Sequence, residues 1–368
     1  MIKFTILRRF FLAPFSFIFG MTTTLRRRAF QKGWLRSETF EIPTICVGNL
    51  RVGGTGKTPL VEYIAKFLSQ YHQIAILSRG YGRKTKGYIN ASETQNLSSK
   101  IIGDEPMQYV SKFPNVEVAV CEKRKTGIEN LMNKNPKLDG IILDDAYQHL
   151  SVNYALKIVL TEYYRAFFED FPIPSGYLRE FRNAAKYADI IVITKCPETL
   201  TKEEKEDFIQ KIKPQPHQEV FFTKLQVTSY ELQEPHTAYR TSHTVHRIPY
   251  TTHRILITGI DNPAPLVHHL ENEFKEIHTL HFPDHHDFTK KDIEKIIRLK
   301  EKFGGDDCTI ITTEKDAMRL QAFDNMPEFY VALIKIGFLE KETVFKEKLL
   351  SLFRQENEEE FAANQKRY

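Results

Sequence analysis

The chain has 368 residues, enough for two α/β domains, and its hydrophobic content of 41% excludes an intrinsically disordered protein. The net charge of +5 is concentrated at one end, because residues 1–36 hold eight Lys and Arg residues and no acid, which leaves −3 for the remainder. No nucleic-acid-binding motif accompanies this charge, so we expect a membrane surface as its partner and no nucleic acid.

An apolar run, FFLAPFSFIFGM at residues 10–21, lies between the N-terminal basic clusters. It is shorter than the roughly 20 residues that cross a bilayer. Aromatic and aliphatic residues flanked by arginines predict a helix that lies in the membrane interface, so we assign residues 1–36 as a membrane-associating segment. Two alternatives remain. One is a cleavable signal peptide, although no small-residue cleavage site follows, and the other is a helix packed on the first domain.

A glycine-rich segment, VGNLRVGGTGKTP at residues 47–59, follows a predicted strand and precedes a predicted helix. Glycines let backbone N–H groups turn toward phosphate oxygens, while a Lys reaches the terminal phosphates and a Thr hydroxyl binds Mg²⁺. The usual loop has glycine where this chain has Arg51, so the spacing is a variant. The alternative is a glycine-rich turn with an incidental lysine. The predicted nucleotide-binding residues are Gly53, Gly54, Thr55, Gly56, Lys57 and Thr58.

Apolar runs alternate with helical patterns over residues 37–220 and predict a P-loop NTPase-like domain with a doubly wound, mostly parallel sheet. The predicted strands are 42–47, 73–77, 116–120, 140–143, 156–161 and 189–194. The cysteines lie in or beside such runs without metal-ligand spacing, so we interpret them as buried thiols in a reducing compartment. They are Cys46, Cys121, Cys196 and Cys308.

The remaining chain predicts a second, smaller α/β domain. A strand-like run at 219–226 leads into a polar stretch, and we assign 221–252 as a linker or interdomain ribbon. Residues 253–353 form the second domain, with a helix capped by Thr289, and 354–368 form a polar tail. Its predicted strands are 254–258, 276–281, 308–312 and 329–335.

Two carboxylates, Asp144 and Asp145, end the apolar run that begins at residue 140. An acid at a strand end downstream of a phosphate loop is the usual Mg²⁺ partner, and the alternative is an ordinary strand terminus. Two further acidic segments stay open. The GDEP segment at 103–106 is either a loop or a helix N-terminus, and PDHHD at 283–287 is either a polar turn or a His–carboxylate pair.

Basic residues follow several predicted strands, where open α/β sheets bind ligands. We therefore expect a positive surface that contacts phosphate. Its candidate residues are Arg79, Arg83, Arg124 and Arg179. The TKCP segment at 194–197 lacks the acid of a guanine-reading motif, which favours ATP over GTP.

Several segments together resemble the tetraacyldisaccharide 4′-kinases of lipid A biosynthesis. They are VGNLRVGGTGKTP, SRGYGRK, GDEP, DDAYQH, PSGYLRE, FPDHHDFT and TTEKDAMRL, in the family's order. The resemblance implies transfer of the ATP γ-phosphate to the 4′-hydroxyl of a tetraacylated glucosamine disaccharide 1-phosphate. It places this reaction at the cytoplasmic face of the bacterial inner membrane, with the protein bound peripherally through its N-terminal segment.

The resemblance also implies site residues. Asp104 and His285 are similar to the family's catalytic dyad, in which the carboxylate accepts the proton of the sugar hydroxyl. Lys57 would stabilise the transferred phosphate, while Thr58, Asp144 and Asp145 would hold Mg²⁺. The remaining implied substrate- or phosphate-binding residues are Glu105, Gln148 and His149, together with the four arginines above.

Departures from the family pattern at Ala146, Tyr147, Ser175 and Tyr177 concern the shape of the substrate site more than the reaction. Two competing readings remain. A membrane-surface P-loop NTPase switch explains the loop and the N-terminus but not GDEP or PDHHD. A soluble sugar or nucleotide kinase does not explain the basic, apolar N-terminus.

Overall fold

The computed structural model describes residues 2–233, 251–274, 276–284 and 286–365, with side chains from 11 to 353. These residues divide into two compact units that are discontinuous in the chain. Unit 1 comprises residues 1–79, 121–225 and 336–368, and unit 2 comprises 80–120 and 226–335. Segment 80–120, which we placed in a nucleotide-binding domain at 37–220, therefore lies with unit 2.

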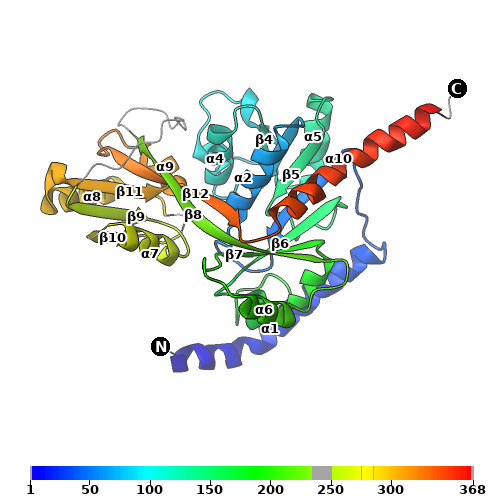
Figure 1. Cartoon of the computed structure of the whole chain (residues 1–368), viewed down its shortest axis with the longest axis horizontal. Coiled ribbons are helices and arrows are strands. Elements are labelled where there is room, and N and C mark those ends of the chain that lie inside the picture. Colours follow the sequence, from blue (N-terminus) through cyan, green and yellow to red (C-terminus); the bar gives the residue numbers. More distant parts are fainter. Residues whose placement is uncertain (1, 234–250, 275, 285, 366–368) are drawn as a thin grey trace. The chain divides into compact units, whose positions relative to one another are not determined.

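Unit 1 is built on a parallel sheet with the strand order β8-β7-β6-β1-β5-β2 (Figure 1). From β1 the sheet continues to β5 and β2 on one side and to β6, β7 and β8 on the other, as in doubly wound folds. Strands β1, β5 and β7 are buried along their whole length, which agrees with their continuous apolar runs. The strands are β1 (Thr44–Asn49), β2 (Ile74–Ser78), β5 (Gly140–Asp144), β6 (Leu156–Glu162), β7 (Ile190–Thr194) and β8 (Glu219–Gln233).

Helices cover both faces of this sheet. Side chains of successive strand residues point to opposite faces of a sheet. In β8, Phe222 packs with Phe208 of α6 on one face, and Phe221 packs with Phe345 of α10 on the other. The helices of unit 1 are α1 (Ile2–Gln31), α2 (Lys57–Leu68), α5 (Arg124–Lys134), α6 (Lys202–Ile212) and α10 (Glu342–Gln365). Short 3₁₀ turns lie at Phe167–Glu169 and Arg182–Tyr187.

Helix α1 packs on unit 1 through one stripe of small and charged residues. Ser16 accepts a hydrogen bond from the backbone N–H of Ser175 at 2.8 Å, and a Cβ on Gly20 would overlap the Phe181 ring. Arg27 is buried and forms a bidentate pair with Glu180 at 2.8 and 2.7 Å. The helix is thus held to the unit, and Arg27 is unavailable to lipid headgroups, contrary to our expectation for the N-terminal arginines.

Unit 2 contains a second sheet with the strand order β10-β9-β11-β12 and a short antiparallel pair, β3 and β4. Helix α7 packs on one face of the second sheet, through Leu266 and Leu270, and α8 packs on the other, through Ile293 and Ile296. The strands are β3 (Ile89–Asn90), β4 (Glu117–Val120), β9 (His253–Thr258), β10 (Ile277–His281), β11 (Cys308–Thr313) and β12 (Phe329–Phe338). The helices are α3 (Ser99–Ile102), α4 (Asp104–Lys112), α7 (Ala264–Glu273), α8 (Lys290–Lys302) and α9 (Glu314–Leu320), with 3₁₀ turns at Ala91–Glu93 and Gly305–Asp307.

The α/β class and the predicted strands are confirmed, with two differences in extent. Strand β8 continues to Gln233, into the stretch that we assigned as a linker, and residues 234–250 of that stretch lie outside the described residues. Helix α10 continues to Gln365, whereas we expected the helix to end near Phe353 and a polar tail to follow. Glutamates such as those at 356 and 358–360 are good helix formers, so polarity alone did not mark the helix end.

Candidate functional site

The glycine-rich segment forms a strand–loop–helix turn in unit 1. Strand β1 ends at Asn49, the loop covers residues 50–56, and α2 begins at Lys57. The first backbone N–H groups of a helix have no partner inside the helix, and the helix dipole adds positive potential there. Residues 53–58 therefore form the kind of helix N-terminus that binds phosphate groups.

Two glycines are required by the backbone here. Gly56 precedes α2 with φ of 85°, in the left-handed region that side chains with a Cβ rarely adopt. Gly48 lies under Tyr147, because a Cβ on Gly48 would come within 2.6 Å of the Tyr147 Cβ and 2.9 Å of its backbone nitrogen. The loop shape and the packing of β1 beneath the segment after β5 both depend on these positions.

Polar side chains brace the loop from beneath. Asn49 Nδ2 donates to the Arg51 carbonyl and to Thr55 Oγ1, both at 2.7 Å. Thr194, at the end of β7, donates to the Thr55 carbonyl at 2.8 Å, and Lys195 donates to the Gly54 carbonyl at 2.5 Å. The carbonyls of Arg51, Gly54 and Thr55 thus accept hydrogen bonds from side chains of the protein, and the TKCP segment supports the loop.

Arg51, which replaces the usual first glycine, has a structural role. Its guanidinium pairs with Asp170 at 2.5 Å and lies 4.7 Å from the centre of the Tyr177 ring. The backbone N–H of Val52 donates to the Tyr177 carbonyl at 2.8 Å. The variant loop is therefore fixed by residues 170–179, and Tyr177, one of the departures from the family pattern, contacts it directly.

The two predicted acids lie at the carboxyl end of β5, beside the phosphate loop. The parallel register pairs Asp144 with Val47 of β1, which brings both strand ends together. Asp144 is fully buried. The Asp145 carboxylate lies 3.7 Å from Lys57 Nζ and 2.7 Å from Arg179 Nη1. Burial raises the pKa of Asp145, but the charges of Lys57 and Arg179 outweigh it and hold the pKa well below its usual range, so the group is ionised.

Gln148 and His149 follow these acids and belong to the same cluster. Gln148 accepts from Arg179 at 3.3 Å and donates to the Asn49 carbonyl at 2.9 Å, so it joins the acidic turn to the end of β1. Burial, together with the charges of Arg124 and Arg79, lowers the pKa of His149 to about 4. His149 is therefore neutral at pH 7 and can accept or donate a hydrogen bond without carrying charge.

The arginines of unit 1 differ in exposure. Arg79 is exposed just beyond β2, and Arg179 contacts Asp145 as described. Arg124 is only 1% exposed and donates to the carbonyls of Cys121 at 2.6 Å and Asp144 at 3.0 Å. We expected Arg124 to be an exposed residue that contacts phosphate. It is instead buried, and its guanidinium orders the backbone that carries the two acids.

Three of the predicted site residues that the structure describes lie in unit 2. Asp104 and Glu105 begin α4, so the GDEP segment is a helix N-terminus and not a loop. Asp104 accepts a hydrogen bond from Arg319 Nε at 2.9 Å and a second from Arg319 Nη2. Arg83 donates to the Gly87 carbonyl at 2.7 Å, within its own turn.

His285, the predicted partner of Asp104, lies outside the described residues. Its neighbour His286 lies 3.1 Å from Asp292, and the His286 carbonyl accepts from Arg319 at 3.3 Å. One guanidinium thus connects α4 to the PDHHD segment.

Sequence reasoning missed three residues that hold these sites together: Arg319, Lys195 and Asp170. Arg319 lies in the TTEKDAMRL segment, and that segment was the only signal for it. Lys195 and Asp170 were not assigned roles, because their partners lie far from them in the chain. Arg319 and Lys195 bind the predicted site residues Asp104 and Gly54, whereas Asp170 binds Arg51 of the same loop.

Comparisons with known proteins place the chain in a family. The model of the family described as tetraacyldisaccharide-1-P 4′-kinase matches residues 8–354. A tetraacyldisaccharide 4′-kinase of Flavobacterium johnsoniae is 40% identical over 351 residues, which cover 95% of this chain and 98% of the relative. That of Bacteroides thetaiotaomicron is 39% identical over 317 residues, 84% of this chain and 82% of the relative. A crystal structure of LpxK from Aquifex aeolicus in complex with ATP has a TM-score of 0.69 at 27% identity and covers 94% of this chain and 99% of that one. The chain belongs to the tetraacyldisaccharide-1-phosphate 4′-kinase family.

Proposed function

We propose that this kinase transfers the γ-phosphate of ATP to the 4′-hydroxyl of a tetraacylated glucosamine disaccharide 1-phosphate. The observation that supports this proposal most directly is the phosphate loop beside the acidic turn, where Lys57 Nζ lies 3.7 Å from Asp145 Oδ1. Phosphoryl transfer needs positioning and charge stabilisation more than covalent chemistry from the protein. Backbone N–H groups of residues 53–58 would hold the phosphates, and Lys57 would stabilise charge on the transferred group.

The donor set beside the loop fits Mg²⁺. Thr58, Asp144 and Asp145 offer hydroxyl and carboxylate oxygens, which are the hard ligands that Mg²⁺ prefers. Asp145 is ionised, as its lowered pKa requires for binding a cation. When bound, Mg²⁺ would neutralise phosphate charge during transfer. Lys57 and Arg179, which now pair with Asp145, would turn toward the phosphates of bound ATP.

The acceptor hydroxyl needs a base, and we propose Asp104 for that role, with His285 as its partner. Asp104 is fixed by the Arg319 guanidinium, which sets the direction of the carboxylate. Arg79, Arg83, Arg179, Glu105, Gln148 and His149 would contribute to binding of the phosphates and the sugar. In this proposal Arg124 acts indirectly, through the Asp144 backbone.

Radiolabel transfer tests the reaction. With γ-labelled ATP, Mg²⁺ and a detergent-dispersed tetraacyl disaccharide 1-phosphate, we expect label in the lipid and loss of that label when Mg²⁺ is chelated. The control omits the lipid. Phosphate release that is independent of lipid, without labelled lipid, would contradict the proposal and identify a membrane-surface NTPase instead.

We further propose that α1 binds the cytoplasmic face of the inner membrane peripherally. The face opposite Ser16, Gly20 and Arg27 exposes large apolar side chains at helical spacing, which are Phe11, Phe15, Ile18 and Leu25. Within the described residues, no helix has the length and apolarity needed to cross a membrane. Such a face flanked by arginines fits insertion into the headgroup boundary.

Replacing the exposed face tests this role more cleanly than deleting residues 1–36, because deletion would also remove the buried Arg27–Glu180 pair. We expect Phe11→Gln, Phe15→Gln and Ile18→Gln together to weaken binding to phosphatidylglycerol-containing vesicles by about 100-fold, since each side chain loses part of its transfer free energy. Tyr71→Gln, at another exposed aromatic residue of unit 1, is the control. Equal vesicle binding by the triple variant and the control would exclude α1 as the anchor.

A further inference from the structure

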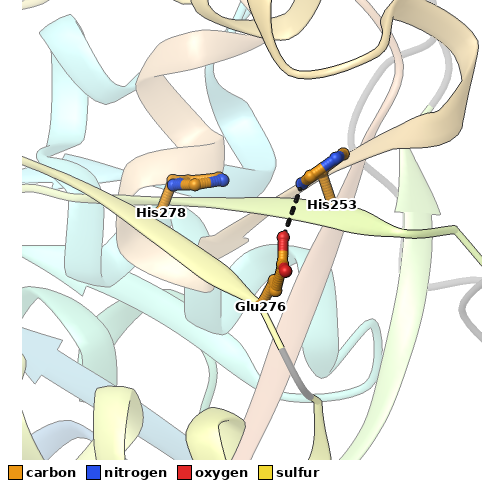
Figure 2. Close-up of side chains that lie close together, drawn as sticks. All are labelled: His253, Glu276 and His278. Carbon is orange, nitrogen blue, oxygen red and sulfur yellow. Dashed lines mark ion pairs between the residues drawn. The ribbon is translucent and has the colours of Figure 1, made fainter.

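Two histidines and a glutamate converge at the amino end of two strands of the unit 2 sheet. Figure 2 shows His253 at the start of β9 with Glu276 and His278 on the neighbouring segment at the start of β10. One ligand atom from each of the three lies within 4.8 Å of the other two. His253 lies 23 residues before Glu276 in the chain, and the parallel pairing of β9 with β10 brings the two together.

The strand register explains why the side chains share a face. Ile277 pairs with Arg254 and His278 with Ile255, so alternation puts His253, Glu276 and His278 on the same side as Ile255. This is the face covered by α8. Phe303, at the end of α8, stacks on the His278 ring with centroids 3.5 Å apart and planes at 11°. The His278 ring is therefore held in one orientation.

Two imidazole nitrogens of the cluster make no hydrogen bond within the described part of the chain. His278 Nε2 is buried and has no hydrogen-bond partner among the described residues. His253 Nδ1 lies 3.0 Å from Glu276 Oε2, yet in the described part of the chain it makes no hydrogen bond of acceptable geometry. A buried imidazole nitrogen without a partner is costly unless something binds it.

We propose that His253, Glu276 and His278 form a binding site for Zn²⁺ or a similar divalent transition metal. Two imidazoles and one carboxylate are a donor set typical of zinc, whereas Mg²⁺ and Ca²⁺ prefer oxygen ligands alone. Tetrahedral bonds of 2.0–2.2 Å place ligand atoms about 3.3 Å apart, so a small contraction of the cluster would complete the site. Glu276 is half exposed and free to supply that movement, and a water molecule would take the fourth position.

Three protein ligands and a water are also the ligand count of catalytic zinc sites, but the place of this cluster in the sheet favours a stabilising role. β10 is the outermost strand of its sheet, and a shared metal would fasten it to β9. Asp307 places a carboxylate near the cluster, because its side chain and the His253 ring both border Gly304. A Cβ added to Gly304 would lie 3.5 Å from Asp307 Cβ and 3.7 Å from His253 Cδ2. The PDHHD segment leaves β10 at the opposite, carboxyl end of the strand. Metal binding should therefore stabilise unit 2 without taking part in phosphoryl transfer.

The test titrates the full, tag-free chain with ZnCl₂ by calorimetry after removal of metals with a chelator, in excess Mg²⁺ to occupy any oxygen-rich site. We expect one Zn²⁺ per chain. Glu276→Gln should weaken binding by more than the 10–100-fold typical of outer-shell residues, because a direct ligand is lost. His268→Gln removes an exposed histidine of α7 and should bind Zn²⁺ as the unchanged chain does. Equal affinity in all three proteins would overturn the proposal.

Three further measurements complement the titration: Co²⁺ absorption, thermal unfolding and kinase activity. Co²⁺ in place of Zn²⁺ should give visible d–d absorption of a four-coordinate ion in the unchanged chain and not in Glu276→Gln or His253→Asn. Zn²⁺ should raise the thermal unfolding midpoint of the unchanged chain but not that of Glu276→Gln. Glu276→Gln should retain full lipid kinase activity, and a loss of activity without a loss of metal affinity would contradict a structural metal site.

Discussion

Lys57→Ala is expected to lower kcat/KM for lipid phosphorylation by about 10³-fold, the upper range for losing one preorganised group that stabilises transition-state charge. Lys57 begins α2 and faces the Asp145 carboxylate at 3.7 Å, so its ammonium belongs to the phosphate loop. The fold should survive the change. Arg179 still pairs with Asp145 at 2.7 Å and keeps the pKa of that carboxyl low.

The measurement is the initial rate of label transfer, with ATP binding followed separately to divide the loss between affinity and turnover. Lys66→Ala is the matched control, because Lys66 is an exposed lysine in the last turn of the same helix. An activity of Lys57→Ala equal to that of Lys66→Ala would remove the loop from the catalytic site.

The phosphate loop was predictable because its signal is local. The strand, the glycines and the helix that follow one another at 44–68 form the site by themselves, and the parallel register then brings Asp144 beside Val47. The braces of the loop were not predictable. Lys195 lies 141 residues from the Gly54 carbonyl that it binds, and Arg51 lies 119 residues from Asp170. No periodicity or spacing encodes contacts of that range.

Helix α1 also combines a feature that the sequence predicts with contacts that only the tertiary structure reveals. Its apolar residues and flanking arginines predicted a helix at the membrane interface, and membrane binding by its exposed face stays a prediction. The alternative of a helix packed on the domain is confirmed by the contacts of Ser16, Gly20 and Arg27. The buried stripe depends on Phe181, Ser175 and Glu180, which lie far along the chain. Sequence pattern therefore identified the helix, but the buried role of Arg27 required the tertiary structure.

Asp104→Asn is expected to lower kcat by about 10²-fold or more with little change in the KM for ATP, because the amide keeps the side-chain shape but cannot accept the sugar hydroxyl proton. Asp104 also pairs with Arg319, which joins α4 to α9, so a loss of activity could arise from loosened packing alone. A control must break the same helix contact without touching Asp104. Lys112→Gln does so, since Lys112 of α4 pairs with Glu314 of α9.

Lys112→Gln should lower the thermal unfolding midpoint while leaving kcat unchanged, whereas Asp104→Asn should lower kcat even at temperatures where it is fully folded. If both variants lose stability and neither loses kcat, Asp104 is a structural partner of Arg319 and not a base. His285→Ala completes the argument. When two residues act as one unit, the double variant is no slower than either single variant, so additive losses in Asp104→Asn with His285→Ala would show that the pair does not act together.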